Sequence, residues 1–379
     1  MKFTFTCILF FLVLFSYAQS YEEYMNQASK AIDDKNPEQA YYIFETAFKD
    51  KAKIGKYDLV NAAMVAAKVN QNKIAIDWLT KSISKGLGST KEELDYVLND
   101  SSYSELHNDR KWKKIIKGVT KNFLKEKHNK QKDSTKWIQS ISKRGKTINR
   151  KSALRPGFAL HFKNYNGIEV PYLVYVPKNI KKNNKNKTVV FLHGGVVNQG
   201  EFNYKDPRTK EEPIFKIADS LNCIVIYPFG KKSFGWVNQP KAFQNILEII
   251  QETLAIYPID RNEIFLGGMS NGGTAVFWFA SQKPNMFNGF FAISGLPQLS
   301  FEPIQFNNIS QGKPFYSIND KNDQIYDINE IQHIYDLQKD LATDWKFKTI
   351  ESSGHGFIYE PEKGVEILIS LLKDLLNDK

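Results

Sequence analysis

The chain has 379 residues, of which 42% are hydrophobic, 13% aromatic and 25% charged. This composition is that of a globular protein of two or three domains, and it excludes a largely disordered chain, a collagen and a coiled-coil rod. The formal net charge is +11, but the lysines are scattered, and the one dense tract, at residues 178–187, is typical of a solvated turn. Because no nucleic-acid-binding motif accompanies them, we expect no nucleic-acid partner.

The first eighteen residues have the pattern of a secretory signal peptide. Lys2 precedes an apolar run over residues 7–15, and small residues stand at Ser16 and Ala18. The run is too short to span a membrane, so we predict cleavage after Ala18, export to a periplasm or out of the cell, and no membrane span in the mature chain. An uncleaved N-terminal anchor is the alternative.

Cleavage at that position would leave Cys223 as the only cysteine. It lies in an apolar, strand-like run, which is typical of an inert buried thiol. A single cysteine forms no internal disulfide, and no Cys/His cluster has the spacing of a zinc site. We therefore expect no structural metal.

Residues 19–125 are predicted to form a small helical module. The segment is rich in Ala, Lys, Glu and Leu, and small and large side chains alternate at spacings of four and three in two places. These positions are Ala40, Phe44 and Ala47, and then Ala75, Leu79 and Ser82. The pattern resembles the tetratricopeptide repeat, although generic helix pairs would give a similar one. Such a module would dock a protein partner or act as a spacer.

Residues 126–152 carry few large apolar side chains and are predicted to be a linker, with a short helix around Trp137 and Ile138. From residue 153 to 379, strands alternate with helices. The expected strands are 158–162, 169–176, 188–192, 223–227, 264–266, 289–293, 315–318 and 345–350. The expected helices are 213–221, 243–257, 273–281, 328–341 and a last one that ends at 376. An antiparallel start followed by repeated strand–helix units predicts an α/β fold, a mostly parallel sheet with helices on both faces.

The sharpest motif is Gly268-Met269-Ser270-Asn271-Gly272. An apolar strand runs into it and a helix rich in small residues follows. Glycines two residues before and after the serine remove side chains that would clash in so tight a turn. This context predicts that Ser270 is a nucleophile, and a glycine-rich turn with a bystander serine is the alternative.

A serine nucleophile needs a histidine base. In this arrangement the chain order is the serine, then an acid, then the histidine. His355 lies between two glycines in the loop after the last predicted strand, whereas His333 lies in the middle of a predicted helix. His193 precedes the serine and is predicted to fix a turn. We therefore predict that His355 is the base.

The acid is expected in the loop after the strand 315–318. This loop offers Asp320 and Asp323, with Asp327 close behind. Turn capping is the alternative role for these carboxylates. Their order between the serine and the histidine is the one that a catalytic triad in this arrangement requires.

Two backbone donors are expected to stabilise the negative charge that develops on the substrate carbonyl oxygen. One is the N–H of Asn271, at the start of a helix. The other is expected in His193-Gly194-Gly195-Val196, directly after a buried strand. Within that turn Gly195 is favoured, and Val196 is the second choice.

From residue 153 onward the chain resembles the polyhydroxybutyrate depolymerase and feruloyl esterase branch of the α/β-hydrolases. The motifs that carry the resemblance are 193–195, 227–230, 236–238, 260–273, Asp323 and His355. Three features depart from it. The usual further polar pattern after 193–195 is absent, as are the disulfides of secreted fungal members, and the helical module is not part of the usual enzyme.

The resemblance implies an exported serine esterase that hydrolyses a small-molecule or polymeric carboxylic ester without a metal or cofactor. An acyl-enzyme would form on Ser270, with His355 as base and then acid. The family pattern favours Asp323 over Asp320 as the acid that orients the histidine.

Aromatic residues near the motifs are candidates for the wall of the substrate site. Phe229 and Trp236 are the first of them. Trp278 is another, although its position in the helix after the serine also fits a core residue.

Two other functions fit parts of this pattern. A serine peptidase of the prolyl oligopeptidase type would share the fold and the order of the triad, but its usual propeller domain is missing. A non-catalytic scaffold would act through the helical module, and the presence of Ser270, Asp323 and His355 argues against it.

Overall fold

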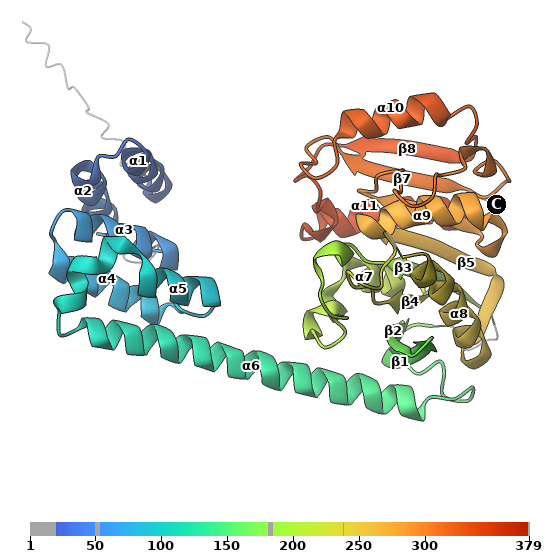
Figure 1. Cartoon of the computed structure of the whole chain (residues 1–379), viewed down its shortest axis with the longest axis horizontal. Coiled ribbons are helices and arrows are strands. Elements are labelled where there is room, and N and C mark those ends of the chain that lie inside the picture. Colours follow the sequence, from blue (N-terminus) through green and yellow to red (C-terminus); the bar gives the residue numbers. More distant parts are fainter. Residues whose placement is uncertain (1–19, 50–53, 181–184, 238, 378–379) are drawn as a thin grey trace, which may run out of the picture. The chain divides into compact units, whose positions relative to one another are not determined.

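The structure is a computed structural model that describes residues 20–49, 54–180, 185–237 and 239–377. These residues form two compact units, 20–132 and 133–377, which we call the helical unit and the sheet unit (Figure 1). The predicted signal peptide, residues 1–18, lies outside the described residues. Within the described part of the chain, no helix is both long and apolar enough to cross a membrane.

The helical unit consists of helices that pack against their neighbours in the chain. They are α1 (Tyr21–Asp33), α2 (Pro37–Ala47), α3 (Lys56–Lys68), α4 (Asn72–Ser84), α5 (Lys91–Asn99), the 3-10 helix η1 (Ser101–Asn108) and the first part of α6 (Trp112–Thr147). Ser20 begins α1 with a capping box to Glu23, which satisfies two backbone N–H groups at the helix start. All six positions of the predicted repeat are buried, and four of them belong to an alanine-rich core, namely Ala40, Phe44, Ala75 and Leu79. The tetratricopeptide-like identity of the unit stays a prediction.

Residues 126–147, predicted as most of a linker, instead continue helix α6. The prediction of only a short helix is wrong for these residues, because a scarcity of apolar side chains does not prevent helix formation, whereas the boundary between the two units, after residue 132, falls inside the predicted linker. Lys, which is frequent here, is a good helix former. Within the sheet unit the helix is also anchored, since Ile141 is buried and Trp137 Nε1 donates a 3.0 Å hydrogen bond to the Tyr204 carbonyl.

The sheet unit contains eight strands in the order β1-β2-β4-β3-β5-β6-β7-β8. The strands are β1 (Gly157–Tyr165), β2 (Ile168–Val176), β3 (Asn186–Leu192), β4 (Ile224–Pro228), β5 (Ile259–Met269), β6 (Gly289–Ile293), β7 (Phe315–Asp320) and β8 (Trp345–Ile350). β2 pairs antiparallel with both β1 and β4, and all other pairs are parallel. The predicted mostly parallel α/β sheet is confirmed.

Helices cover both faces of this sheet (Figure 1). They are α7 (Pro213–Leu221), α8 (Pro240–Ile256), α9 (Asn271–Gln282), α10 (Ile328–Gln338) and α11 (Lys363–Asn377). Successive strand residues alternate between the faces, so Val190 and Leu192 join a core with α8 and α9, whereas Val189 and Phe191 join a core with α7 and α11. The carboxyl ends of the parallel strands meet at one edge of the sheet, where their loops can bring polar side chains together.

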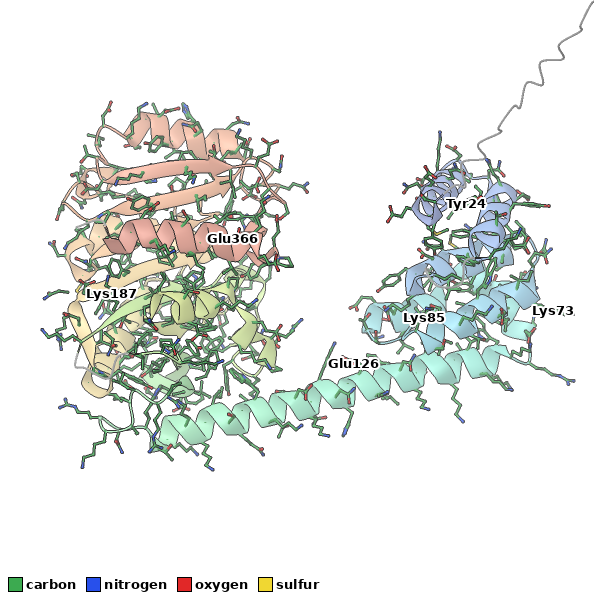
Figure 2. All side chains as sticks on the ribbon, turned by 180° about the vertical axis from the view of Figure 1, so that it is seen from behind. Tyr24, Lys73, Lys85, Glu126, Lys187 and Glu366 are labelled. Carbon is green, nitrogen blue, oxygen red and sulfur yellow. The ribbon has the colours of Figure 1, made fainter. Side chains whose placement is uncertain are left out.

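The charged side chains are spread over the surfaces of both units. Figure 2 shows labelled examples, among them Lys73 and Lys85 in the helical unit and Glu366 in the sheet unit. This distribution agrees with the scattered lysines of the sequence.

Candidate active site

Ser270 lies in the sharp turn between β5 and α9. Its φ of +57° and ψ of −120° are rare for a residue with a side chain, and two backbone hydrogen bonds hold the turn. The Ser270 N–H donates to the Ile293 carbonyl at 2.8 Å, and the Thr274 N–H donates to the Ser270 carbonyl at 2.9 Å. The turn therefore presents the hydroxyl at the carboxyl edge of the sheet.

The glycines that flank the serine are required by close packing. A Cβ atom on Gly268 would lie 2.4 Å from the carbonyl carbon of Gly272. A Cβ atom on Gly272 would lie 1.9 Å from the carbonyl oxygen of Leu192, at the end of the neighbouring strand β3. Both contacts are with backbone, which cannot move aside cheaply. This explains the spacing of the sequence motif.

A chain of hydrogen bonds connects the serine to a histidine and a carboxylate. His355 Nε2 lies 2.8 Å from Ser270 Oγ, and His355 Nδ1 lies 2.7 Å from Asp323 Oδ2. The Asp323 side chain is fully buried, and its Oδ1 atom accepts hydrogen bonds from the N–H groups of Ile325 and Tyr326 at 2.8 and 3.0 Å. The structure thus brings together the three residues that the sequence predicted as a triad.

Asp320, the second choice for the acid, has a different position. It is fully buried at the end of β7, and its carboxylate accepts the N–H of Asn322 at 2.8 Å and the N–H of Gly354 at 3.1 Å. These bonds tie the Asp323 loop to the His355 loop. We therefore regard Asp320 as a residue that positions the acid and the base relative to each other.

His193 is held within the turn that follows β3. Its Nδ1 atom lies 2.7 Å from the Gly194 carbonyl, and its Nε2 atom accepts the Gly230 N–H at 3.0 Å. Burial lowers the pKa of His193 to about 4, so the ring is neutral at pH 7 with Nδ1 protonated. This geometry agrees with the predicted turn-fixing role and leaves His193 far less suited than His355 to act as a base.

The two predicted oxyanion donors, Asn271 and Gly195, line the cleft that contains Ser270. Asn271 is the first residue of α9, so its N–H has no partner within the helix. Gly195 has a φ of +71°, a left-handed conformation that favours glycine, where the turn after β3 leads into a short 3-10 helix. The role of both residues as donors stays a prediction.

The serine opens into a cleft of about 610 Å³. Its lining residues are His193, Gly194, Gly195, Val197, Asn198, Gln199, Asn203, Thr209, Glu212, Tyr227, Phe229, Met269, Ser270, Asn271, Ile325, Tyr326, His355 and Tyr359. Phe229 is among them, as the sequence predicted. The wall is otherwise mixed, with apolar side chains such as Ile325 next to several amides and the Glu212 carboxyl group.

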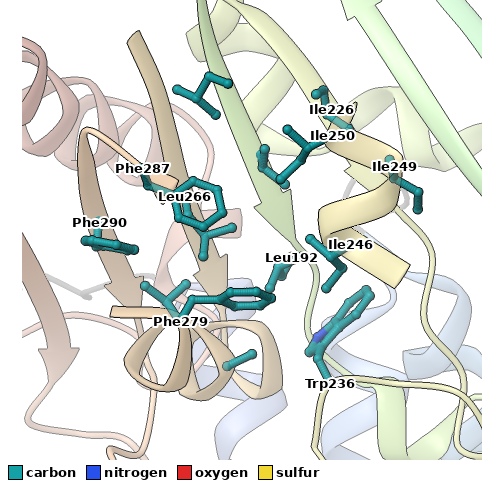
Figure 3. Close-up of a cluster of buried hydrophobic side chains, with 14 of the residues drawn as sticks. Leu192, Ile226, Trp236, Ile246, Ile249, Ile250, Leu266, Phe279, Phe287 and Phe290 are labelled. Atoms are coloured by element: carbon teal, nitrogen blue, oxygen red, sulfur yellow. The ribbon is translucent and has the colours of Figure 1, made fainter. Parts of the chain in front are cut away.

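Trp236 does not line this cleft, so its predicted place in the substrate wall is not supported. Figure 3 shows it among buried hydrophobic side chains such as Ile246 and Leu192. Its indole N–H donates to the His193 carbonyl at 3.1 Å, so the ring supports the turn from within. Trp278 is also absent from the lining residues and donates to Glu302 at 2.6 Å.

Three cleft residues have no motif that could have identified them from the sequence. Tyr326 accepts a hydrogen bond from the Asn271 side-chain amide at 3.2 Å and packs edge-on against His355. Glu212 and Tyr359 come from distant segments and are hydrogen-bonded to each other. Among the described residues, no group of three or more His, Cys, Asp or Glu side chains is arranged to hold a metal ion.

The strand order, the serine turn at the end of β5 and the position of the acid and histidine loops define an α/β-hydrolase fold. Residues 237–373 match the model of the phospholipase/carboxylesterase family. The match includes the serine, acid and histidine loops but covers only part of the chain.

Two curated relatives are similar over part of the chain. A bifunctional acetylxylan esterase/xylanase of Neocallimastix patriciarum is 27% identical over 161 residues, which are 42% of this chain and 22% of that protein. Feruloyl esterase D of Neurospora crassa is 30% identical over 141 residues, which are 35% of this chain and 47% of that protein. The chain thus spans less than half the length of either relative.

Among solved structures, a thermostable esterase is 22% identical with a TM-score of 0.45, and the similarity covers 56% of this chain and 62% of that chain. Esterase 2 of Thermogutta terrifontis is 14% identical with a TM-score of 0.48, covering 59% of this chain and 95% of that one.

Proposed function

We propose that the protein is a serine esterase that hydrolyses a carboxylic ester through an acyl-enzyme. The observation that carries the proposal is the hydrogen-bonded chain from Ser270 through His355 to Asp323, placed in a cleft on an α/β-hydrolase sheet. The partial match to the phospholipase/carboxylesterase family supports it. The same complete chain argues against a non-catalytic scaffold.

The first half of the reaction transfers the acyl group to the enzyme. Ser270 Oγ attacks the carbonyl carbon of the ester while His355 Nε2 takes the hydroxyl proton. Asp323 stabilises the imidazolium and holds its orientation, and the N–H groups of Asn271 and Gly195 would stabilise the negative charge on the carbonyl oxygen. The carbon–oxygen bond to the alcohol then breaks, and His355 gives its proton to the leaving alcohol.

The second half releases the acid. His355, neutral again, takes a proton from a water molecule as the water attacks the acyl carbon. The bond to Ser270 Oγ breaks, the serine regains the proton from His355, and the carboxylic acid leaves the cleft. Every proton is returned, so this sequence needs no other reactant than the ester and water.

The test is hydrolysis of p-nitrophenyl acetate, butyrate and octanoate and of methyl ferulate. Acetyl and feruloyl groups are included because the names of the two curated relatives refer to them. We expect Ser270→Ala to lower kcat by about 10⁴-fold or more. Ser220→Ala is the matched control, because this exposed serine lies on α7 outside the cleft. Equal turnover by wild type and Ser270→Ala would reject the proposal.

Export and a protein partner of the helical unit are separate proposals. For export, expression in a bacterial host with fractionation and N-terminal sequencing is the test, and the exported chain is expected to begin at Gln19. A first residue of Met1 in the exported or membrane fraction would instead support an uncleaved anchor.

A further inference from the structure

A polar pair that the triad does not use lies in the same cleft. Glu212 stands just before α7, and Tyr359 ends the 3-10 helix η6 (Phe357–Tyr359), which follows the His355 loop. The Tyr359 hydroxyl donates to Glu212 Oε2 at 3.2 Å, although the two residues are 147 positions apart in the chain. Both line the cleft into which Ser270 opens. We call these two residues the Glu212–Tyr359 pair.

The Glu212 side chain has no evident structural task. It occupies the N-cap position of α7, but it makes no capping hydrogen bond to that helix. Within the described residues, Tyr359 is the only side chain that donates to its carboxyl group. Burial raises the pKa of Glu212 to about 7 because too few donors compensate for the lost water. A partly buried carboxyl group with unused hydrogen-bonding capacity is suited to a polar ligand.

The surroundings of the pair favour a neutral group that carries a hydroxyl. Tyr227 and Phe229 line the same cleft, and their rings pack edge-on with centroids 5.4 Å apart. An anion would be repelled by Glu212 in its ionised form. A hydroxyl group both donates and accepts, so it can bind the carboxyl group in either protonation state and can also bind the tyrosine hydroxyl.

We propose that the Glu212–Tyr359 pair binds a hydroxyl group of the ester substrate and makes the enzyme prefer hydroxylated esters to their unsubstituted analogues. This inference rests on the proposed esterase function. The hydroxyl can belong to the acyl part, as in a hydroxyaryl acid, or to the alcohol part, as in a sugar. A site built to bind a hydroxyl discriminates against an analogue that lacks it, because the polar groups of the site are then left unpaired.

The test uses two pairs of esters that differ mainly in hydroxylation. Methyl p-coumarate and methyl cinnamate form the acyl pair, and a monoacetylated methyl xyloside and cyclohexyl acetate form the alcohol pair. The full-length wild type, Glu212→Gln and Tyr359→Phe are compared by the ratio of kcat/KM within each pair. Glu211→Gln is the matched control, because Glu211 is exposed and does not line the cleft.

We expect the wild type and Glu211→Gln to prefer the hydroxylated ester in one pair by about tenfold or more, and we expect each cleft variant to lose most of that preference. The pair of esters that responds identifies the part of the substrate that carries the hydroxyl. Equal ratios in all four proteins for both pairs would overturn the inference. So would a preference for an ammonium-bearing ester that depends on Glu212. Turnover of p-nitrophenyl acetate by the wild type, measured in parallel, tests the esterase function separately.

Discussion

The helical unit and the sheet unit each hold a partly or fully buried glutamate, and the two have opposite properties. In the helical unit, Glu93 accepts hydrogen bonds from the Tyr57 hydroxyl and from the N–H groups of Gly88 and Ser89, and it pairs with Lys56. Burial alone would raise its pKa, but these partners lower the pKa to about 2. In the sheet unit, Glu212 has the Tyr359 hydroxyl as its donor, and burial raises its pKa to about 7.

The number of hydrogen-bond donors around a buried carboxyl group distinguishes a structural role from a binding role. Glu93 is surrounded by donors from its own chain, so it stabilises the fold and has little capacity left for a ligand. Glu212 lies in a cleft with unused capacity, so it costs stability and is available for binding. The same distinction separates the units, since the predicted chemistry lies in the sheet unit and the contacts of the helical unit serve packing.

The largest expected effect is on kcat, which should depend on a residue of the sheet unit and not on the buried glutamate of the helical unit. Asp323→Asn should lower kcat for p-nitrophenyl acetate by about 10⁴-fold, because an amide cannot hold His355 in the tautomer that accepts the serine proton. Glu93→Gln should leave kcat within about twofold, since Glu93 belongs to the other unit. A large loss of kcat in Glu93→Gln, with the fold retained, would contradict this separation.

The next effect is on folding. Glu93→Gln should lower the free energy of unfolding of the helical unit by about 3 kcal/mol at pH 7. The ordinary pKa of 4.5 is lowered in the folded state, so this contribution is present above pH 4.5 and is lost as the pH falls toward 2. Urea denaturation followed by circular dichroism measures it. The exposed Glu105→Gln serves as control and should change the unfolding midpoint very little.

Glu212 should show the opposite dependence on pH. Its pKa is raised from 4.5 to about 7, so the wild type loses stability as the pH rises from about 4.5 to about 7. Tyr227 and Tyr359 face Glu212, but their pKa values are raised and they do not titrate in this range. In Glu212→Gln, the free energy of unfolding should therefore fall by about 2 kcal/mol less than in the wild type over this rise in pH. The comparison of wild type and variant at pH 5 and pH 8 cancels other titrating groups, including His193, and an equal loss in both proteins would contradict the assignment.

The smallest effect concerns an ion pair on the surface. Lys81 and Asp77 form a pair one turn apart on α4, with side chains that are 55% and 58% exposed. Lys81→Gln should change the free energy of unfolding by less than about 0.5 kcal/mol, because water and salt screen this pair. If Lys81→Gln lowered the free energy of unfolding as much as Glu93→Gln, exposure to water would not explain the difference between the ion pairs of Asp77 and Glu93.

Much of the sheet unit could be predicted because its signals are local. Each strand is a short apolar run between turn residues, and the serine motif requires its glycines by direct backbone contact. The order of serine, acid and histidine then pointed to His355 and to the loop of Asp320 and Asp323, and the family pattern favoured Asp323, which the structure brings together with His355 and Ser270. The residues alone did not separate Asp320 from Asp323; the contacts of Asp320 with the N–H groups of Asn322 and Gly354 do so in the structure.

The failures have physical causes that the sequence does not display. The polar composition after residue 126 suggested a linker, but helix propensity and the anchors at Trp137 and Ile141 extend α6 to Thr147. Trp236 was expected in the substrate wall because it lies near the motifs in the sequence. Aromatic side chains occur both in substrate walls and in cores, and only the three-dimensional position of the ring decides between the two. The Glu212–Tyr359 pair depends on a contact between distant segments, which no local pattern encodes.

The segment that follows β8 carries both the proposed base, His355, and the hydroxyl of Tyr359, only four positions further along. An insertion or a change of backbone path between them would alter the rate of acyl transfer and the choice of substrate at the same time. Exchange of this segment is therefore a poor route to a new specificity in the laboratory. The region before α7 contributes Glu212 without a triad residue, so it is the better place to vary which esters are accepted while turnover is preserved.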